Sequence, residues 1–85
     1  MAAATLSLAT IDRDCVVGAN VTIENSVLLP GAVVLEGATI RDSIIGPGAT
    51  IGRGATLEAT CVIGGGVSVP GGSILRGEVR LGGPE

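Results

Sequence analysis

Large aliphatic residues recur along this chain every six residues, with two steps of five, and the residue two positions before each is small or β-branched. We call the aliphatic position i. Its occupants are Ile11, Val17, Ile23, Leu28, Val34, Ile40, Ile45, Ile51, Leu57, Ile63, Val69, Leu75 and Leu81. Position i−2 is held by Ala9, Cys15, Val21, Ser26, Ala32, Ala38, Ser43, Ala49, Ala55, Cys61, Val67, Ser73 and Val79. Because side chains alternate along a strand, positions i−2 and i point to one side and positions i−1 and i+1 to the other. The pattern therefore predicts a series of short strands over residues 9–81, each burying its i−2 and i side chains.

Turns rich in glycine separate these strands, and residues 45–57 (IGPGATIGRGATL) show two successive copies of the unit. Glycine adopts the positive φ that tight turns need, and proline presets φ before it. Hexapeptide repeats of this kind are typical of a parallel β-helix. Since three strands close one triangular coil, we predict an all-β fold, a single-stranded parallel β-helix of about four coils. Residues 1–85 would form this one domain, with residues 1–8 extending the first coil and residues 82–85 (GGPE) as a tail.

Composition agrees with a narrow core and argues against several kinds of site. The chain has no Phe, Tyr or Trp, no His, and a net charge of −3, with Arg as its only basic residue. A nucleic-acid partner is not expected, because such proteins present basic patches with stacking side chains. A membrane partner is not expected either, because no apolar run approaches about 20 residues. The sequence shows no catalytic, cofactor-binding or metal-binding motif, so we predict no catalytic residue, cofactor or metal.

The two cysteines, Cys15 and Cys61, both occupy inward i−2 positions, on different faces of the predicted prism. A disulfide or a metal site needs paired geometry that this register does not provide. We interpret them as buried, reduced thiols. Residues 1–10 are apolar but lack the basic start of a signal peptide, so we expect a cytoplasmic location.

Placing every third repeat in register brings charged residues together on one face. Glu24, Arg41, Glu58 and Arg76 fall at i+1 of successive coils and form an outward column of alternating sign. Such a ladder contributes little stability, because exposed ion pairs are screened by solvent. It does specify the register, since a slip by one coil would set like charges opposite each other.

The adjacent face is apolar on its outside. Val27, Ile44 and Val62 fall at outward i−1 positions there, flanked by Leu29. One interpretation is that β-branched residues simply suit strands. The other is that a contiguous exposed apolar patch marks an interface, and we therefore predict an interaction surface formed by Val27, Leu29, Ile44 and Val62. With open strand edges at both ends of the coil stack, this surface leads us to expect a homo-oligomer.

Particular segments resemble known families. The repeat resembles the left-handed β-helices of bacterial acyltransferases, of γ-class carbonic anhydrases, and of the C-terminal domains of sugar-1-phosphate nucleotidyltransferases. Residues 23–28 (IENSVL) and 40–45 (IRDSII) look like the short coils of the nucleotidyltransferase domains. Residues 75–80 (LRGEVR) are similar to the tail of mannose-1-phosphate guanylyltransferases and glucose-1-phosphate thymidylyltransferases.

The resemblance implies a left-handed coil and a non-catalytic module. Those enzymes carry their chemistry in an N-terminal nucleotide-binding domain with catalytic Lys and Asp residues, and their β-helix packs against that domain and mediates oligomerisation. This chain carries none of that machinery, so it is not expected to be an enzyme alone. Two alternatives stay open: a free-standing self-assembling solenoid, natural or engineered, and an acyltransferase-type enzyme, against which the missing histidine argues.

Overall fold

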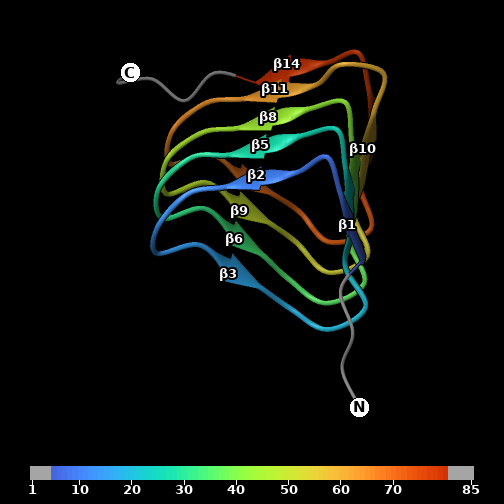
Figure 1. Cartoon of the computed structure of the whole chain (residues 1–85). Helices are drawn as coiled ribbons and strands as arrows, with labels where there is room; N and C mark the ends of the chain where they lie inside the picture. Colours follow the sequence, from blue (N-terminus) through green and yellow to red (C-terminus); the bar gives the residue numbers. More distant parts are fainter. Residues whose placement is uncertain (1–4, 81–85) are drawn as a thin grey trace.

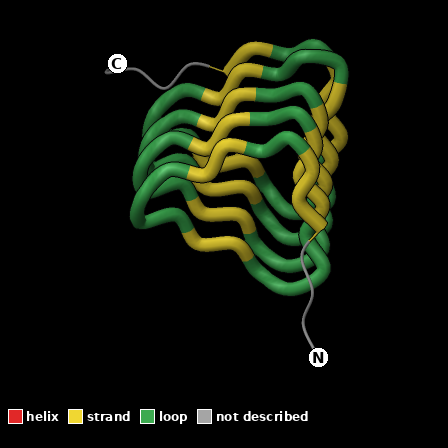
Figure 2. Tube along the Cα trace, in the orientation of Figure 1, coloured by secondary structure: helices red, strands yellow, loops and turns green. Residues whose placement is uncertain are grey.

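The computed structural model describes residues 5–80, which wind into stacked triangular coils (Figures 1 and 2). These residues form short strands and, within that range, no helix. The strands are β1 (Thr5–Ser7), β2 (Thr10–Ile11), β3 (Val16–Val17), β4 (Thr22–Glu24), β5 (Val27–Leu28), β6 (Val33–Val34), β7 (Thr39–Arg41), β8 (Ile44–Ile45), β9 (Thr50–Ile51), β10 (Thr56–Glu58), β11 (Val62–Ile63), β12 (Ser68–Val69), β13 (Ile74–Arg76) and β14 (Val79–Arg80). The predicted all-β parallel solenoid of about four coils is confirmed; its left-handed winding stays an expectation from the resemblance.

Three parallel sheets form the sides of the prism. Sheet A has the order β1-β4-β7-β10-β13, sheet B the order β14-β11-β8-β5-β2, and sheet C the order β12-β9-β6-β3. Each of the first four coils contributes one strand to each sheet, so coil 1 contains β1, β2 and β3. Within residues 5–80, coil 5 contains β13 and β14. Residues that lie side by side in adjacent coils are therefore 17 or 18 positions apart in sequence.

The core is a column of small and aliphatic side chains along the axis of the prism. From Ile23 to Leu75, every predicted aliphatic i residue is at most 4 % exposed. The small i−2 residues Ala32, Ala38, Ala49 and Ala55 are fully buried beside them. Strand alternation alone thus predicted which side of each strand faces inward.

Each corner of a coil contains at least one residue with positive φ. Gly31 (φ 79°) and Gly54 (φ 68°) serve corners after sheets B and C, as the glycine-rich turns predicted. Gly46 has a different role, because a Cβ on this residue would lie 2.6 Å from the backbone of Gly64 in the next coil. Any residue with a side chain at position 46 would therefore hold coils 3 and 4 apart.

The first end of the repeat agrees with the sequence prediction, and the last end differs from it. Strand β1 pairs with β4 and sets Leu6 beside Ile23, so residues before position 9 belong to the first coil, as expected. Val79 was expected to point inward, but it pairs with Val62 on the outer side of sheet B and is 58 % exposed. The inward position belongs instead to Arg80, which pairs with Ile63.

The reason for this difference is a short corner. Gly77 (φ 58°) closes the last turn from sheet A to sheet B in the way that Asn25 and Asp42 close the earlier ones. The step from Leu75 to the next inward residue is therefore one residue shorter than the hexapeptide period suggests. The inward position assigned to Leu81, and the tail at residues 82–85, lie outside the described residues.

Candidate interaction surface

The predicted apolar column exists on the outer side of sheet B. Val27 pairs with Ile44, and Ile44 pairs with Val62, so the three side chains lie one above another in successive coils. Ile44 is 45 % exposed, and its two neighbours are partly exposed. The column continues beyond the prediction, to Thr10 in coil 1 and to Val79 in coil 5.

Leu29 lies in the neighbouring column, directly after β5, and its side chain is partly exposed. The equivalent positions in the next two coils are Gly46 and Gly64, as the backbone bonds from Leu29 N to Ile45 O (2.9 Å) and from Gly46 N to Ile63 O (2.6 Å) show. The surface therefore has a projecting leucine in coil 2 and no side chain beside it in coils 3 and 4. Leu29 was predicted from the sequence, but the two glycines beside it were not, because only the coil register places them there.

Sheet C presents a second, smaller apolar area. Val16 (54 % exposed) pairs with Val33 in β6, and Leu35 (37 % exposed) follows that strand. The same outward column becomes polar in later coils, at Thr50 and Ser68. The apolar part of sheet C thus spans fewer coils than the column on sheet B, which makes sheet B the stronger candidate for an interface.

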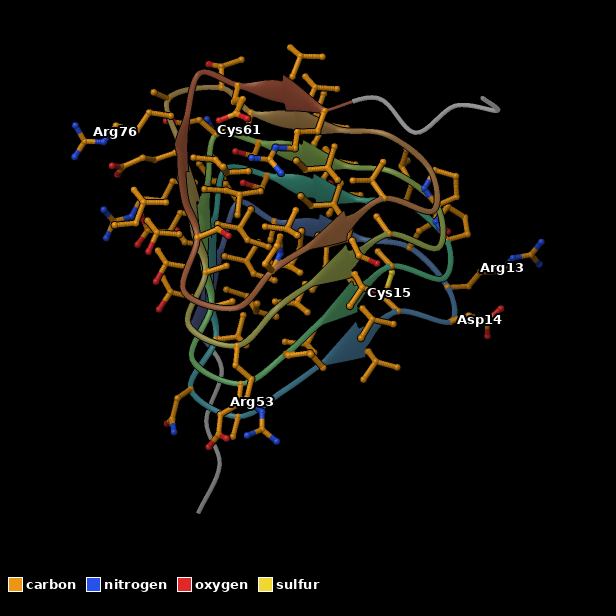
Figure 3. The ribbon with its side chains drawn as sticks, turned by 180° about the vertical axis from the view of Figure 1, so that it is seen from behind. Arg13, Asp14, Cys15, Arg53, Cys61 and Arg76 are labelled. Atoms are coloured by element: carbon orange, nitrogen blue, oxygen red, sulfur yellow. The ribbon has the colours of Figure 1, made fainter. Side chains whose placement is uncertain are left out.

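The charged ladder on sheet A is confirmed as a column of ion pairs. Glu24 lies 3.3 Å from Arg41, and Glu58 lies 2.8 Å from Arg76, in both cases measured from the Nε of the arginine. Figure 3 shows Arg76 pointing away from the prism. Since the arginine side chains are 50 % and 73 % exposed, solvent screens both pairs and they contribute little to stability.

A shallow hollow of about 390 Å³ lies beside this ladder, lined by Arg41, Asp42, Glu58, Ala59 and Arg76. It forms where the corner after β10 contains one residue more than its neighbours, with Ala59 and Thr60 both at positive φ (59° and 69°). The charges lining it cancel, and both arginines already contact a glutamate of the ladder. The hollow therefore has no strong preference for a charged ligand. It was not predicted from the sequence.

The two thiols lie apart, on different sheets, and both are free (Figure 3). Cys61 is buried, and its Sγ is 3.3 Å from Glu58 O and 3.4 Å from Leu75 O. Cys15 is partly buried, with its Sγ 3.2 Å from Leu29 O. Among the described residues, His, Cys, Asp and Glu do not gather into a group that would hold a metal ion.

A triangular prism with a buried aliphatic axis and one apolar outer face defines a class of protein: a β-solenoid module built from hexapeptide repeats. The family described as the GMPPB C-terminal domain matches residues 3–82, which is nearly the whole chain. The chain therefore belongs to this family of β-helical domains from sugar-1-phosphate nucleotidyltransferases. Among curated proteins, none matches the chain significantly. No helix in residues 5–80 is long and apolar enough to cross a membrane.

Proposed function

We propose that this chain is the assembly module of a nucleotide-sugar-forming enzyme, of the mannose-1-phosphate guanylyltransferase type. In this proposal the module holds copies of the enzyme together and packs against a catalytic domain that is not part of the chain. The transfer of a nucleotide to a sugar 1-phosphate takes place in that other domain. Family membership supports the enzyme class, and the two reduced thiols fit a cytoplasmic setting.

The observation that carries the assembly role is the unbroken apolar column on sheet B. Its members Val27, Ile44, Val62 and Val79 stand one per coil, so they form one continuous surface rather than scattered exposed residues. Continuous apolar surface of this kind is stabilised when a partner removes it from water, by about 25 cal/mol per Å². We infer that the partner at this surface is a second copy of the chain.

The interface on one face is small. Five strands about 4.8 Å apart, each crossing a side about 20 Å wide, give roughly 450 Å² per copy. The total of about 900 Å² is at the low end of specific protein interfaces, where association is weak and transient. The isolated module should therefore form dimers at micromolar or higher concentrations, and a longer enzyme would add further contacts.

The test is the mass of the chain in solution, measured by light scattering over a concentration series. The wild-type chain should change from monomer to dimer as the concentration rises. Ile44→Glu should stay monomeric, because it sets two carboxylates near each other at the centre of the interface. Its β-type circular dichroism should not change, because residue 44 points outward.

Thr50→Glu is the matched control. Thr50 lies in the same coil, also at an outward strand position, but on sheet C. This variant should dimerise like the wild type. A wild-type chain that stays monomeric at the highest concentration would refute self-association, and a Thr50→Glu monomer would move the interface to sheet C.

A further inference from the structure

We infer that coil 1 is a detachable end coil, which opens and recloses as one unit while the following coils stay folded. Its strands β1, β2 and β3 each lie at the edge of their sheet. Within residues 5–80, coil 1 therefore hydrogen-bonds to one neighbour, coil 2, which is formed by β4, β5 and β6. The inference is independent of the proposed function, because it concerns contacts within a single chain.

The side chains of coil 1 are less buried than those of the next coil. Every residue from 6 to 20 is exposed or partly buried, whereas Ile23 and Leu28 in coil 2 are fully buried. Leu6 is 50 % exposed although it lies at an inward position beside Ile23. Since buried apolar surface supplies much of the stability of a packed element, coil 1 loses less on opening than coil 2 would.

Side chains join coils 2 and 3 at the corner from sheet A to sheet B. Residues 24–26 (ENS) of coil 2 lie beside residues 41–43 (RDS) of coil 3. Three consecutive contacts connect them: Glu24 with Arg41 (3.3 Å), Asn25 Nδ2 with Asp42 Oδ1 (2.7 Å), and Ser43 N with Ser26 Oγ (3.0 Å). The buried serine bond contributes most of this stabilisation, because solvent screens the exposed ion pair.

The equivalent residues of coil 1 cannot make these contacts. Residues 7–9 (SLA) lie beside residues 24–26 in the coil register. Ser7 is uncharged, and neither Leu8 nor Ala9 has a polar side-chain atom. At this corner, coil 1 is therefore held to coil 2 by its backbone bonds.

A different corner of coil 1 does provide a side-chain contact to coil 2. Cys15 Sγ lies 3.2 Å from Leu29 O, beyond the end of β5. A thiol is a weak donor, so this contact does not replace the missing serine bond.

The backbone at Leu8 adds strain to the corner between β1 and β2. Leu8 has a φ of 52°, and its side chain is 84 % exposed. Asn25 and Asp42, the equivalent residues of the next two coils, belong to the types that adopt positive φ most readily, whereas a bulky leucine does so at a cost. Opening releases this strain and gives up almost no burial of the Leu8 side chain.

Opening of coil 1 uncovers a strand edge that is protected in the closed chain. Ile23, Leu28 and Val34 of coil 2 pair with coil 1 and are fully buried beneath it. Without coil 1, the backbone N–H and C=O groups on that side of coil 2 lose their partners and become available to an added strand. Coil 1 thus acts as a terminal coil that controls access to this edge.

Hydrogen exchange of backbone amides, measured residue by residue by NMR, tests this opening. The amides of coil 1 that donate to coil 2 are those of Thr10, Asp12, Val16 and Gly18. Their equivalents in coil 2, which donate to coil 3, are those of Val27, Leu29, Val33 and Leu35. We expect protection factors that are alike within the coil 1 set and about 100-fold lower than those of the coil 2 set. Measuring Ile44→Glu in parallel separates this difference from any protection due to self-association.

A triple substitution tests the cause of the opening. Ser7→Arg with Leu8→Asn and Ala9→Ser gives coil 1 the types of residue that join coils 2 and 3. The protection factors of the coil 1 amides should rise at least about tenfold, because an ion pair and a serine bond then oppose opening and the strain at residue 8 is relieved. Val16→Thr is the matched control, since it adds a hydroxyl at an outward position of coil 1 on sheet C, beside Val33. It should leave these protection factors unchanged.

Three results would contradict the inference. Equal protection in the coil 1 and coil 2 sets would show that the two coils open only together. Protection that rises steadily from Thr10 to Gly18 would show fraying from the chain end and overturn opening as a unit. Wild-type protection in the triple variant, or an equal rise in Val16→Thr, would overturn the assignment of the opening to residues 7–9.

Discussion

At the scale of single residues, the backbone at Ala59 and Thr60 stores strain. In the other turns from sheet A to sheet B, one residue has positive φ, and in three of the coils it is Asn25, Asp42 or Gly77. Asn, Asp and Gly are the residues that adopt this conformation most readily. The corner after β10 instead puts an alanine and a β-branched threonine there, at φ 59° and 69°. Left-handed backbone costs such residues roughly 1–2 kcal/mol each.

The double substitution Ala59→Asn with Thr60→Gly should therefore stabilise the chain. Two successive residues with positive φ match the turn that Asn-Gly favours most. We expect the free energy of unfolding, measured by urea denaturation, to rise by about 1 kcal/mol. Thr39→Gly in β7 is the control, and it should lower stability by about 0.5–1 kcal/mol because glycine weakens an extended strand. A double variant less stable than the wild type would mean that the native corner is not strained.

At the scale of the strands and corners, buried serines connect one coil to the next. Ser43 is 2 % exposed, and its Oγ donates to Arg41 O (2.7 Å) and accepts a bond from Cys61 N (3.2 Å) in the next coil. Ser26 repeats the arrangement one coil earlier, accepting from Ser43 N at 3.0 Å. At these short corners a hydroxyl satisfies a buried backbone N–H that would otherwise have no acceptor.

Replacing Ser43 with alanine should destabilise the chain by about 1–3 kcal/mol, because the buried N–H of Cys61 loses its acceptor. Ser43→Cys should cost less, since a thiol of similar size is already accommodated at the equivalent position by Cys61. The melting temperatures of both variants, compared with that of the wild type, provide the measurement. Equal melting temperatures for Ser43→Ala and the wild type would show that the serine bonds add nothing to coil stacking.

The strands and their register could be predicted from sequence because both depend on local patterns. Alternation of side chains determined which residues turn inward, and the recurring charges fixed the pairing of Glu24 with Arg41. The last coil was predicted wrongly because Leu81 continues the aliphatic period, whereas the short corner at Gly77 sets Arg80 inward. Sequence alone did not show that corner, since a glycine is compatible with both registers.

The candidate surface was predicted in part, for the same reason. Val27, Ile44 and Val62 follow from counting coils, and the structure brings them together. Val79 was missed because its predicted register was wrong. The position of Gly46 and Gly64 beside Leu29, and the hollow at Ala59, depend on how successive coils stack, which no single repeat contains.

At the scale of the whole molecule, the two ends of the coil stack differ in chemistry. In coil 1, Leu6 occupies an inward position in register with Ile23 but is 50 % exposed, so the first end is apolar. In coil 5, Glu78 and Arg80 occupy the inward positions above Cys61 and Ile63, and Arg80 Nε donates to Glu78 Oε2 at 2.8 Å. An ion pair thus covers the buried axis at the last end. Stacking the first end of another copy there would remove both charges from water and leave them against leucine, which is unfavourable.

Removing the charges should therefore allow end-to-end association. The double substitution Glu78→Val with Arg80→Ile makes the last end apolar like the first. A head-to-tail contact between unlike ends does not close on itself, so the expected products are extended assemblies. The same changes are made in the Ile44→Glu variant, so that the sheet B contact is removed as well. Light scattering and electron microscopy of that protein should then detect growing filaments.

The control is Glu58→Val with Arg76→Ile, which removes a pair with the same Nε–Oε2 distance of 2.8 Å from the outer side of sheet A. The control should not form filaments. If the variant at residues 78 and 80 keeps the mass of Ile44→Glu alone, the ion pair is not what prevents the coils of separate molecules from stacking.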